Sequence, residues 1–402
     1  MRSRKTTRRA ATSIAVGVLM VGVVTACSSS SKDARNGADS PAISGSGGSS
    51  SSAVADAQRI VDAAGKALVY APVDTGSTAS QIVPQTTWQG PKTGPKPLPK
   101  QKVEVVFCAA GTACETVAKG AQAAGQLLGW NVELIPGSGT AQSYATAMDT
   151  ALSRKPDAII GVAIPGASVA DRLATAKQRG IVTVSAPDSP TDGTNPWQAY
   201  VSIRQPLTYQ IMAYQVIADS NGAGDAIVVR QADQPDLIKG VTEYQRVMQS
   251  CPKCRTKVVD LTIPDQTNPA VAGQKLAAAI SSEPGVQYLV LPDDNGFGNM
   301  IAAVQSSGKK IKIIAKDATN LELQAINKGD IYAAPGASLD WMGYAAINQV
   351  NLGLNKQPYL NAYDQGLGIH IYTKADAPAD GTADFTKFVD WVSGYKTLWG
   401  VQ

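Results

Sequence analysis

From residue 103 onward, short apolar runs alternate with longer segments in which apolar residues recur at helical spacing. The apolar runs predict strands at 103–108, 131–135, 158–162, 181–185, 199–203, 226–230, 257–261, 288–291, 311–315 and 331–334. The segments between them predict helices at 115–128, 141–153, 169–178, 207–219, 237–249, 269–281, 297–307 and 321–327. Strands that alternate with helices of about 10–15 residues indicate parallel sheets covered by helices on both faces.

This alternation occurs twice, once up to about residue 203 and again from about residue 204 onward. The chain has 402 residues, a length that allows about two or three domains. We therefore predict the α/β class, with two doubly wound parallel-sheet lobes. Ligands of such sheets bind outside the carboxyl ends of the strands. Two lobes that face each other through those ends form a cleft that closes about a hinge.

The first 26 residues have the layout of an export signal, with a basic start and then small apolar residues. This apolar run is shorter than the ~20 residues of a spanning helix. It ends at Val24-Thr25-Ala26-Cys27, which resembles the bacterial lipoprotein box. We expect residues 1–26 to be a signal peptide and Cys27 to carry a lipid. An ordinary signal peptide that happens to precede a cysteine is the alternative, and the choice between Sec and twin-arginine export stays open.

Two further segments separate Cys27 from the alternating region. Residues 27–53 are dominated by Ser, Gly and Ala and predict a flexible tether. Residues 54–102 predict an extension, in which 54–70 has helical spacing and the Pro-rich stretch 84–100 excludes a helix. The sequence thus predicts a folded body outside the cytoplasm, anchored to the cell membrane by the lipid on Cys27.

Charge and composition narrow the classes of function. The formal net charge is +4, but five cations lie in the first nine residues, and removing these five positive charges from +4 leaves −1. A body this close to neutral has no basic footprint, so we expect no nucleic-acid partner. The single histidine, His370, lies on an apolar strand and argues against His-dependent catalysis. We expect no enzyme activity, no metal site and no cofactor, and a monomer.

Four cysteines remain besides Cys27, namely Cys108, Cys114, Cys251 and Cys254. An even number outside the cytoplasm favours disulfides. Three connectivities are open, and proximity in the sequence favours Cys108–Cys114 and Cys251–Cys254. A zinc site made of all four cysteines is the alternative.

Several segments of the body resemble the periplasmic sugar-binding proteins of the ribose/galactose type, which are the substrate-binding subunits of ABC importers. In the first half these are Lys119-Gly-Ala-Gln-Ala-Ala-Gly, Leu128-Gly-Trp-Asn, Lys155-Pro-Asp-Ala-Ile-Ile and Ala176-Lys-Gln-Arg-Gly-Ile. In the second half they are Leu291-Pro-Asp-Asp-Asn and Ala315-Lys-Asp-Ala. The resemblance implies a multi-strand hinge, with 103–203 and 338–364 in lobe 1 and 204–337 and 365–402 in lobe 2.

The resemblance also implies ligand contacts at particular positions. Asp293 and Asp317 fall where the family has a ligand-binding Asn and Asp, and Lys239 falls on a ligand-binding Arg. Thr112 lies in the segment that matches the first pocket loop, where the family has stacking aromatic rings and this chain has none. We therefore expect the ring to come from elsewhere, and the candidates are Trp197, Tyr200, Phe297 and Trp341.

The residue types themselves suit a polyhydroxylated ligand, because an ionised carboxylate accepts two hydroxyl donors and such bonds are about twice as strong as neutral ones. The expected acceptors on loops after strands are Asp188, Asp293, Asp294, Asn295 and Asp317. The expected donors are Arg204, Lys239 and Lys316. Of the Asp293-Asp294 pair, we expect Asp293 to contact the ligand and Asp294 to cap the next helix or to form an ion pair. Trp341 has the alternative of packing between the lobes, and Asp188 and Lys239 have the alternative of being solvated.

We therefore predict a solute-binding lipoprotein that captures a sugar or polyol and delivers it to an ABC permease. A ligand-presenting chemosensory protein is one alternative. An importer subunit for a nucleoside or an amine is another, because an acidic cleft with aromatic faces suits a cation. A glycosidase built on Asp293 and Asp317 is disfavoured by the importer-like order of the segments. A related repressor is excluded because export signals occupy the place of its DNA-binding helices.

Overall fold

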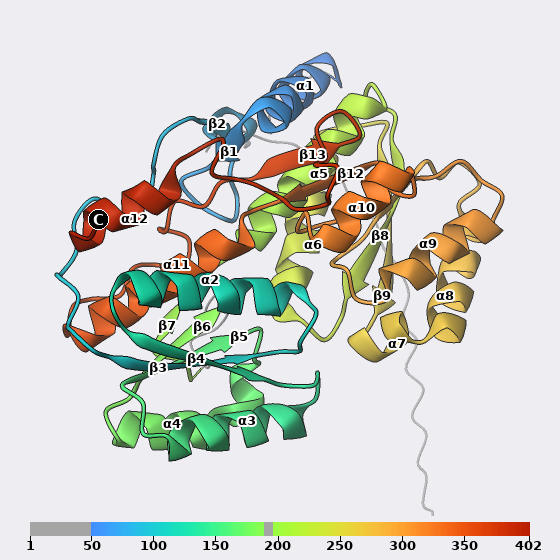
Figure 1. The fold of residues 1–402 in the computed structure, drawn as a ribbon. Coiled ribbons are helices and arrows are strands. Elements are labelled where there is room, and N and C mark those ends of the chain that lie inside the picture. The colour runs from blue at the N-terminus through green and yellow to red at the C-terminus, as the bar shows by residue number, and fades with distance from the viewer. Residues whose placement is uncertain (1–49, 189–195) are drawn as a thin grey trace, which may run out of the picture. The chain divides into compact units, whose positions relative to one another are not determined.

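The structure is a computed structural model that describes residues 50–188 and 196–402 (Figure 1). The expected signal peptide, Cys27 and the tether up to residue 49 lie outside the described residues. Among the described residues, no helix has the length and apolar character needed to cross a membrane.

Lobe 1 is built on a five-stranded sheet with the order β4-β3-β5-β6-β7, in which all paired strands are parallel. Its strands are β3 (Lys102–Phe107), β4 (Asn131–Pro136), β5 (Ala158–Val162), β6 (Val182–Ala186) and β7 (Ala199–Tyr200). Helices α2 (Ala113–Leu127) and α11 (Leu339–Leu354) pack on one face. Helices α3 (Ala141–Ser153) and α4 (Ala170–Gln178), with the short η2 (Gly166–Val169), cover the other face (Figure 1).

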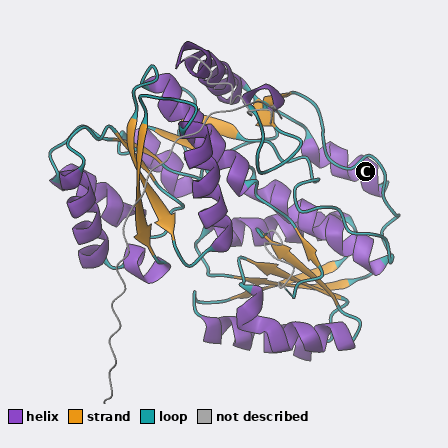
Figure 2. Ribbon diagram, turned by 180° about the vertical axis from the view of Figure 1, so that it is seen from behind, coloured by secondary structure: helices purple, strands orange, loops and turns teal. Residues whose placement is uncertain are grey.

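Lobe 2 is built on a six-stranded sheet with the order β13-β12-β11-β10-β8-β9. Its strands are β8 (Asp225–Gln231), β9 (Arg255–Leu261), β10 (Tyr288–Val290), β11 (Lys312–Ile314), β12 (Ala333–Gly336) and β13 (His370–Thr373). Its helices are α5 (Gln205–Asp219), α6 (Pro235–Met248), α7 (Ile263–Thr267), α8 (Pro269–Ser282), α9 (Phe297–Ser306) and α10 (Asn320–Lys328). Figure 2 shows helices on both sides of each sheet, which confirms the predicted α/β class with two sheets. The edge strand β13 differs from the expectation, because it runs antiparallel to β12.

The chain passes from one sheet to the other at three places within the described residues. These crossovers are 201–204 between β7 and α5, 337–338 between β12 and α11, and 355–369 between α11 and β13. Helices α5 and α11 begin at two of these crossovers and are buried around almost their whole circumference, including polar side chains such as Gln210 and Gln349. The residues next to the hinge are therefore part of the core.

The extension folds onto the body. Helix α1 (Ser50–Lys66) buries Ala57, Ile60 and Ala64 and packs on α5 and β13. It begins at Ser50, so the last four residues of the expected tether are helical. It also ends before residue 70, because β1 (Leu68–Tyr70) pairs with β2 (Val83–Gln85) instead of continuing the helix.

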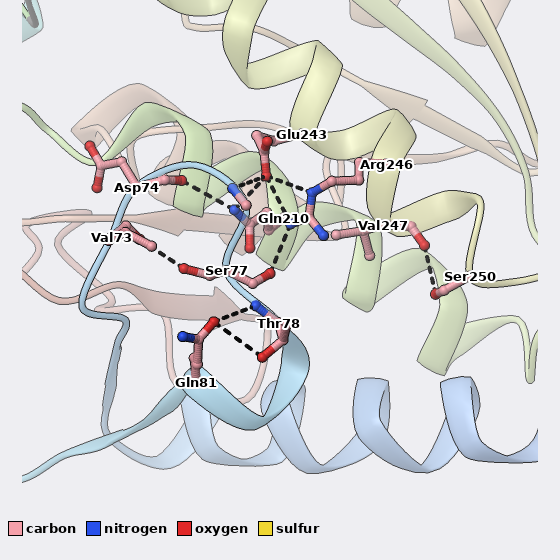
Figure 3. A network of polar contacts seen from close by, with 11 residues as sticks. Val73, Asp74, Ser77, Thr78, Gln81, Gln210, Glu243, Arg246, Val247 and Ser250 are labelled. Atoms are coloured by element: carbon pink, nitrogen blue, oxygen red, sulfur yellow. Dashed lines mark hydrogen bonds and ion pairs between the residues drawn. The ribbon is translucent and has the colours of Figure 1, made fainter. Parts of the chain in front are cut away.

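The loop between β1 and β2, which includes η1 (Ala79–Gln81), is held by a group of charged and amide side chains that we call the hinge network: Asp74, Arg204, Gln210, Glu243 and Arg246. Figure 3 shows Glu243 of α6 accepting hydrogen bonds from Arg246 at 2.8 Å and from Gln210 of α5 at 2.8 Å. Gln210 also donates to the carbonyl of Asp74 at 3.1 Å, and Arg246 donates to the carbonyl of Ser77 at 2.8 Å. The extension is therefore fixed to lobe 2 by buried polar contacts.

The end of the chain forms α12 (Trp391–Trp399), a helix that the sequence pattern did not predict. Trp391 stacks on Trp341 of α11, whose other face stacks on Trp88 of the extension. Tyr395 packs edge-on against Trp88. Although 365–402 was expected to lie in lobe 2, its last helix thus packs against the helix that covers lobe 1.

The structure contains the disulfides Cys108–Cys114 and Cys251–Cys254, the connectivity that proximity favours. The first lies at the end of β3 in lobe 1, and the second lies between α6 and β9 in lobe 2. The four cysteines are therefore not gathered in one place, as the alternative zinc site requires.

Candidate functional site: a cavity between the lobes

A cavity of about 280 Å³ is lined by both lobes. Lobe 1 contributes the start of α2, with residues between 111 and 119, and lobe 2 contributes the loops after β10 and β11. Residues 337–340 at one crossover and 382–385 from the C-terminal segment complete the wall. The cavity therefore lies at the carboxyl ends of β3, β10 and β11, where ligands of parallel sheets bind.

The lobe 1 wall is the N-terminus of α2. The Thr112 hydroxyl caps this helix, accepting from the Cys114 N–H at 3.3 Å and donating to the Ala109 carbonyl at 2.8 Å. Glu115 accepts the Gly111 N–H at 2.6 Å and pairs with Lys119 at 2.8 Å. The Cys108–Cys114 disulfide closes this loop, so its backbone is held from both ends.

Helix α2 must approach α11 closely to bring Asp340 into the wall. A Cβ on Gly120 would lie 2.5 Å from the Asp340 carbonyl oxygen, a distance that no side chain tolerates. The glycine in the Lys119-Gly-Ala-Gln segment is therefore required by packing. Asp340 itself lies in the first turn of α11, after the N-cap Ser338.

The loop after β11 carries Asp317, whose φ of 91° lies in the left-handed region. Its carboxylate pairs with the ammonium of Lys316, a side chain that is only 1% exposed. A Cβ on Gly336 of β12 would lie 2.5 Å from the Asp317 carbonyl carbon, so glycine allows this close approach. Thr319 and Glu322 then cap α10 reciprocally at 2.9 and 3.3 Å.

The loop after β10 carries two adjacent carboxylates with different positions. Asp294 lines the cavity, whereas Asp293 is not among the lining residues and accepts the Asn295 N–H at 2.9 Å. We expected the reverse, with Asp293 at the ligand and Asp294 as a cap or ion-pair partner. The N-cap of α9 is Gly296, and no side chain caps this helix.

Burial disfavours the ionised form of these carboxyl groups. It raises the pKa of Asp293 to about 7, against the opposing effect of Lys316. It also raises the pKa of Asp294 and that of Glu322, and the Asp317 charge raises both further. Desolvation by the surrounding protein raises the pKa of Asp340 as well, although this side chain is exposed at the rim of the cavity. The cavity is thus bordered by carboxyl groups whose charges the protein does not fully compensate.

Residues 103–357 match the periplasmic binding protein domain family. The chain belongs to this family. It is a family of binding proteins and not of enzymes, in agreement with the absence of a catalytic motif from the sequence. No curated protein matches the chain by sequence.

Solved structures of periplasmic binding proteins share the fold. An arabinose-binding protein from Geobacillus stearothermophilus is 19% identical, with a TM-score of 0.59, and the match covers 70% of this chain and 98% of that one. A glucose-galactose-binding protein from the same organism is 17% identical, with a TM-score of 0.60 and coverages of 70% and 100%. An ABC transporter solute-binding protein from Agrobacterium vitis, bound to α-D-tagatopyranose, is 17% identical, with a TM-score of 0.61 and coverages of 72% and 99%. The fold of this chain is therefore the type I periplasmic binding protein fold.

Arg204, an expected ligand donor, lies in the hinge of this periplasmic binding protein. Its side chain is fully buried and forms an ion pair with Asp74. It also donates to the Ala71 carbonyl at 2.5 Å and contacts the Tyr70 ring at 4.8 Å. The guanidinium thus joins the extension to a crossover, and it is not among the residues that line the cavity. This corrects the expectation.

The expected role of Trp341 as a ring at the ligand is also corrected. This side chain is fully buried between Trp88 and Trp391, with ring centroids 5.5 and 5.6 Å apart, and it does not line the cavity. Trp197, Tyr200 and Phe297, the other expected rings, are not lining residues either. Among the described residues, the aromatic side chain in the wall is Phe385. It lies in an irregular segment, where no strand or helix pattern singles it out.

Asp188, Lys239 and Asn295 also lie outside the set of lining residues. Asp188 follows β6 and accepts a hydrogen bond from the Ser185 hydroxyl at 3.1 Å. Lys239 lies on α6, half-buried, and the Asn295 N–H is bonded to Asp293. Among the residues expected to contact the ligand, Thr112 and Asp317 line the cavity, and so does Asp294, for which a structural role was favoured.

Sequence reasoning missed several lining residues besides Phe385. In the sequence, Ser338 and Asp340 indicate only the start of a helix, Ser-Leu-Asp, after the second crossover. Thr319 belongs to a Thr-x-x-Glu capping box, which predicts the start of a helix and not a wall of a cavity. These signals fix the local structure, but the meeting of the two lobes is a tertiary feature.

Proposed function

We propose that the chain is an extracytoplasmic solute-binding lipoprotein that captures a small sugar or polyol in the interlobe cavity and delivers it to an ABC permease. The observation that carries this proposal is the cavity itself, which both lobes line with carboxylates and hydroxyls. A ligand that touches both walls favours the closed arrangement of the lobes, because it gains contacts there that it lacks when they are apart.

The chemistry of the wall suits adjacent hydroxyl groups. Asp294 and Asp317 accept two hydroxyl donors each, and charge-assisted hydrogen bonds are stronger than neutral ones. Phe385, which is 5% exposed, adds an apolar aromatic side chain to the wall against which the C–H side of a ring can pack. The volume of about 280 Å³ is at the small end for ligand sites, which favours a ligand the size of a monosaccharide.

The solved structures support the same class of ligand. Their descriptions name arabinose, glucose and galactose, and tagatopyranose as the sugars that those proteins bind. The proposal that this chain binds a related solute rests on its own cavity together with this fold.

Binding is tested by titration calorimetry of the purified protein against a panel of aldoses, ketoses and alditols. We expect at least one compound with a dissociation constant in the micromolar range or tighter. Asp317→Asn should weaken that binding. Asp149→Asn, on the exposed side of lobe 1 and paired there with Arg172, should leave it unchanged. The absence of any micromolar ligand in the panel would contradict the proposal.

The lipid anchor is a separate part of the proposal and rests on Cys27 and the preceding apolar run. Cys27→Ser should release the protein from the membrane fraction of cells and abolish labelling with a fatty-acid analogue. Cys27→Ser protein that stays in the membrane fraction would overturn the anchor without affecting ligand capture.

A further inference from the structure

More carboxylates than cations line the cavity. The lining carboxylates are Glu115, Asp294, Asp317 and Asp340, and the lining cation is Lys119. Glu115 is matched by Lys119, and Asp317 is matched by Lys316. In the described part of the chain, Asp294 and Asp340 form no ion pair with a Lys, Arg or His side chain.

Two more carboxyl groups lie near this wall. Glu322 is completely buried, and its Oε1 has no hydrogen-bond partner among the described residues. Its ionisation is opposed by the charges of Asp317 and Asp294. Asp293 is on the neighbouring loop, and Lys316 is the cation that acts on Asp293, Asp294 and Glu322 alike. The buried ammonium of Lys316 thus acts on four carboxyl groups, including its ion-pair partner Asp317.

We infer that the ligand carries a positive charge, as a protonated amine on a polyhydroxylated frame such as an amino sugar or an amino polyol. This inference rests on the proposed function and adds the charge of the ligand to it. An ammonium group donates three hydrogen bonds, and its positive charge supplies the ion-pair partner that Asp294 and Asp340 lack. Phe385 places an aromatic side chain in the same wall, and aromatic rings attract cations.

Other ligands fit the wall less well. A neutral sugar satisfies hydrogen bonds but leaves the excess negative charge in place, and a sugar acid or sugar phosphate adds to it. In the described ranges, no three side chains of the kinds that hold metal ions are grouped as a metal site. The carboxylates are instead distributed along the cavity, in reach of different parts of an organic ligand.

The same arrangement links binding to protons. Asp293 faces Lys316, Asp294 and the Tyr209 hydroxyl, and Asp294 faces Asp317, Lys316 and Thr319. The pKa of Asp293 is raised to about 7, so part of this carboxyl group is protonated near neutral pH, and burial raises the pKa of Asp294 as well. An ammonium next to them favours their ionised forms, so binding of the cation should release protons and strengthen as the pH rises from about 5 to about 7, below the pH at which the ligand amine loses its own proton.

The test is titration calorimetry with matched sets of hexoses: the neutral sugar, its 2-amino-2-deoxy analogue, the N-acetylated analogue and the uronic acid. We expect the best amino sugar to bind at least about tenfold more tightly than its neutral and N-acetylated counterparts, and the uronic acid to bind most weakly. Asp294→Asn and Asp340→Asn should each reduce this ratio toward one. Asp149→Asn, outside the cavity, should preserve it.

Each other outcome is decisive. Equal or tighter binding of the neutral sugar would overturn the inference and leave the proposed function standing. Alkyl diamines that bind as tightly as amino sugars would overturn the polyhydroxylated frame, as would calcium alone if it bound with the same affinity. A panel without any ligand would overturn both proposals. Titrations in two buffers of different ionisation enthalpy provide a second readout, because amino sugars should release protons on binding and neutral sugars should not.

Discussion

The hinge network and the interlobe cavity both hold several carboxylates, but they differ in how these charges are matched. In the hinge network, Asp74 pairs with Arg204 and Glu243 pairs with Arg246. Neutral donors complete the arrangement, since Gln210 and the Gly76 N–H both bond Glu243, at 2.8 and 3.0 Å. Each negative charge thus has its own guanidinium, and the group connects the extension, a crossover and lobe 2.

At the cavity the carboxyl groups outnumber the cations beside them. Lys316 is paired with Asp317 and also faces Asp293, Asp294 and Glu322. Burying carboxyl groups without partners costs free energy, and proteins accept such costs mainly at functional sites. The comparison therefore distinguishes paired carboxylates that stabilise the fold from unpaired carboxylates that we assign to ligand binding.

The largest expected effect is the loss of the hinge ion pair. Arg204→Ala leaves Asp74 as an uncompensated buried charge, which typically costs about 3–5 kcal/mol of unfolding free energy. Arg230→Ala is the matched control, because its pair with Asp260 is partly exposed and should contribute at most about 1 kcal/mol. Urea unfolding measures both values. Similar losses for the two variants would show that the hinge network is not a special support of the fold.

The second prediction concerns the pH dependence of stability. Since the pKa of Asp293 is raised to about 7 in the folded protein, the folded state holds a proton that the unfolded state loses near pH 4. The stability from this group is therefore complete below about pH 4 and is lost as the pH rises through about 7.

Asp293→Asn cannot ionise, so it should be more stable than the unmodified protein at pH 8, by an amount on the order of 2 kcal/mol, and lose this advantage toward pH 4. Asp260→Asn, at an exposed ion pair, is the control and should not show this trend. Urea unfolding from pH 4 to pH 8 provides the curves. An Asp293→Asn difference that stays constant with pH would show that the carboxyl is not neutral in the fold.

A third, smaller effect should appear in binding rather than in stability. Replacing Asp294 by Asn removes one charge-assisted acceptor, so ligand affinity should fall by about tenfold. The unfolding free energy should not fall, since Asp294, unlike Asp317, is not the ion-pair partner of Lys316. Calorimetry measures the ligand affinity and urea unfolding measures the unfolding free energy of the same preparation. Loss of stability without loss of affinity would reverse the roles that we assign to cavity and hinge.

The smallest expected effect compares the two disulfides. The Cys108–Cys114 bridge closes the loop that carries Thr112, whereas Cys251–Cys254 lies away from the cavity. Replacing the first pair by Ser frees this wall, and ordering it again should weaken binding by about two- to tenfold. The same change at the second pair should leave affinity unchanged. Equal affinities for both variants would show that the wall does not need the bridge.

Most of the fold could be predicted from the sequence, because buried parallel strands and amphipathic helices leave clear patterns. Helix α12 and the early end of α1 could not, since both depend on distant partners. Trp391 and Trp399 of α12 pack on α11, and the residues that follow α1 pair with β2 and with Ile369. Such contacts between remote segments do not appear in local periodicity.

The site could be predicted only in part. Asp317 and Thr112 follow strands of the two sheets, so chain order alone places them at the cavity. Arg204 and Trp341 were assigned wrongly because their partners, Asp74 and Trp88, belong to the extension, which precedes the segment that matches the family. The sequence around a basic residue near a hinge does not show whether its side chain binds a ligand or pairs with a buried carboxylate.

The central claim is that the unmatched carboxylates of the cavity are the ligand site, and a crystal structure of the protein with its best amino sugar tests it most directly. The account predicts the sugar between the start of α2 and the loops after β10 and β11, with its amine beside Asp294 or Asp340 and its ring against Phe385. A sugar bound elsewhere, for example in the surface hollow between α3 and α4 that Asp149 and Arg172 line, would contradict it.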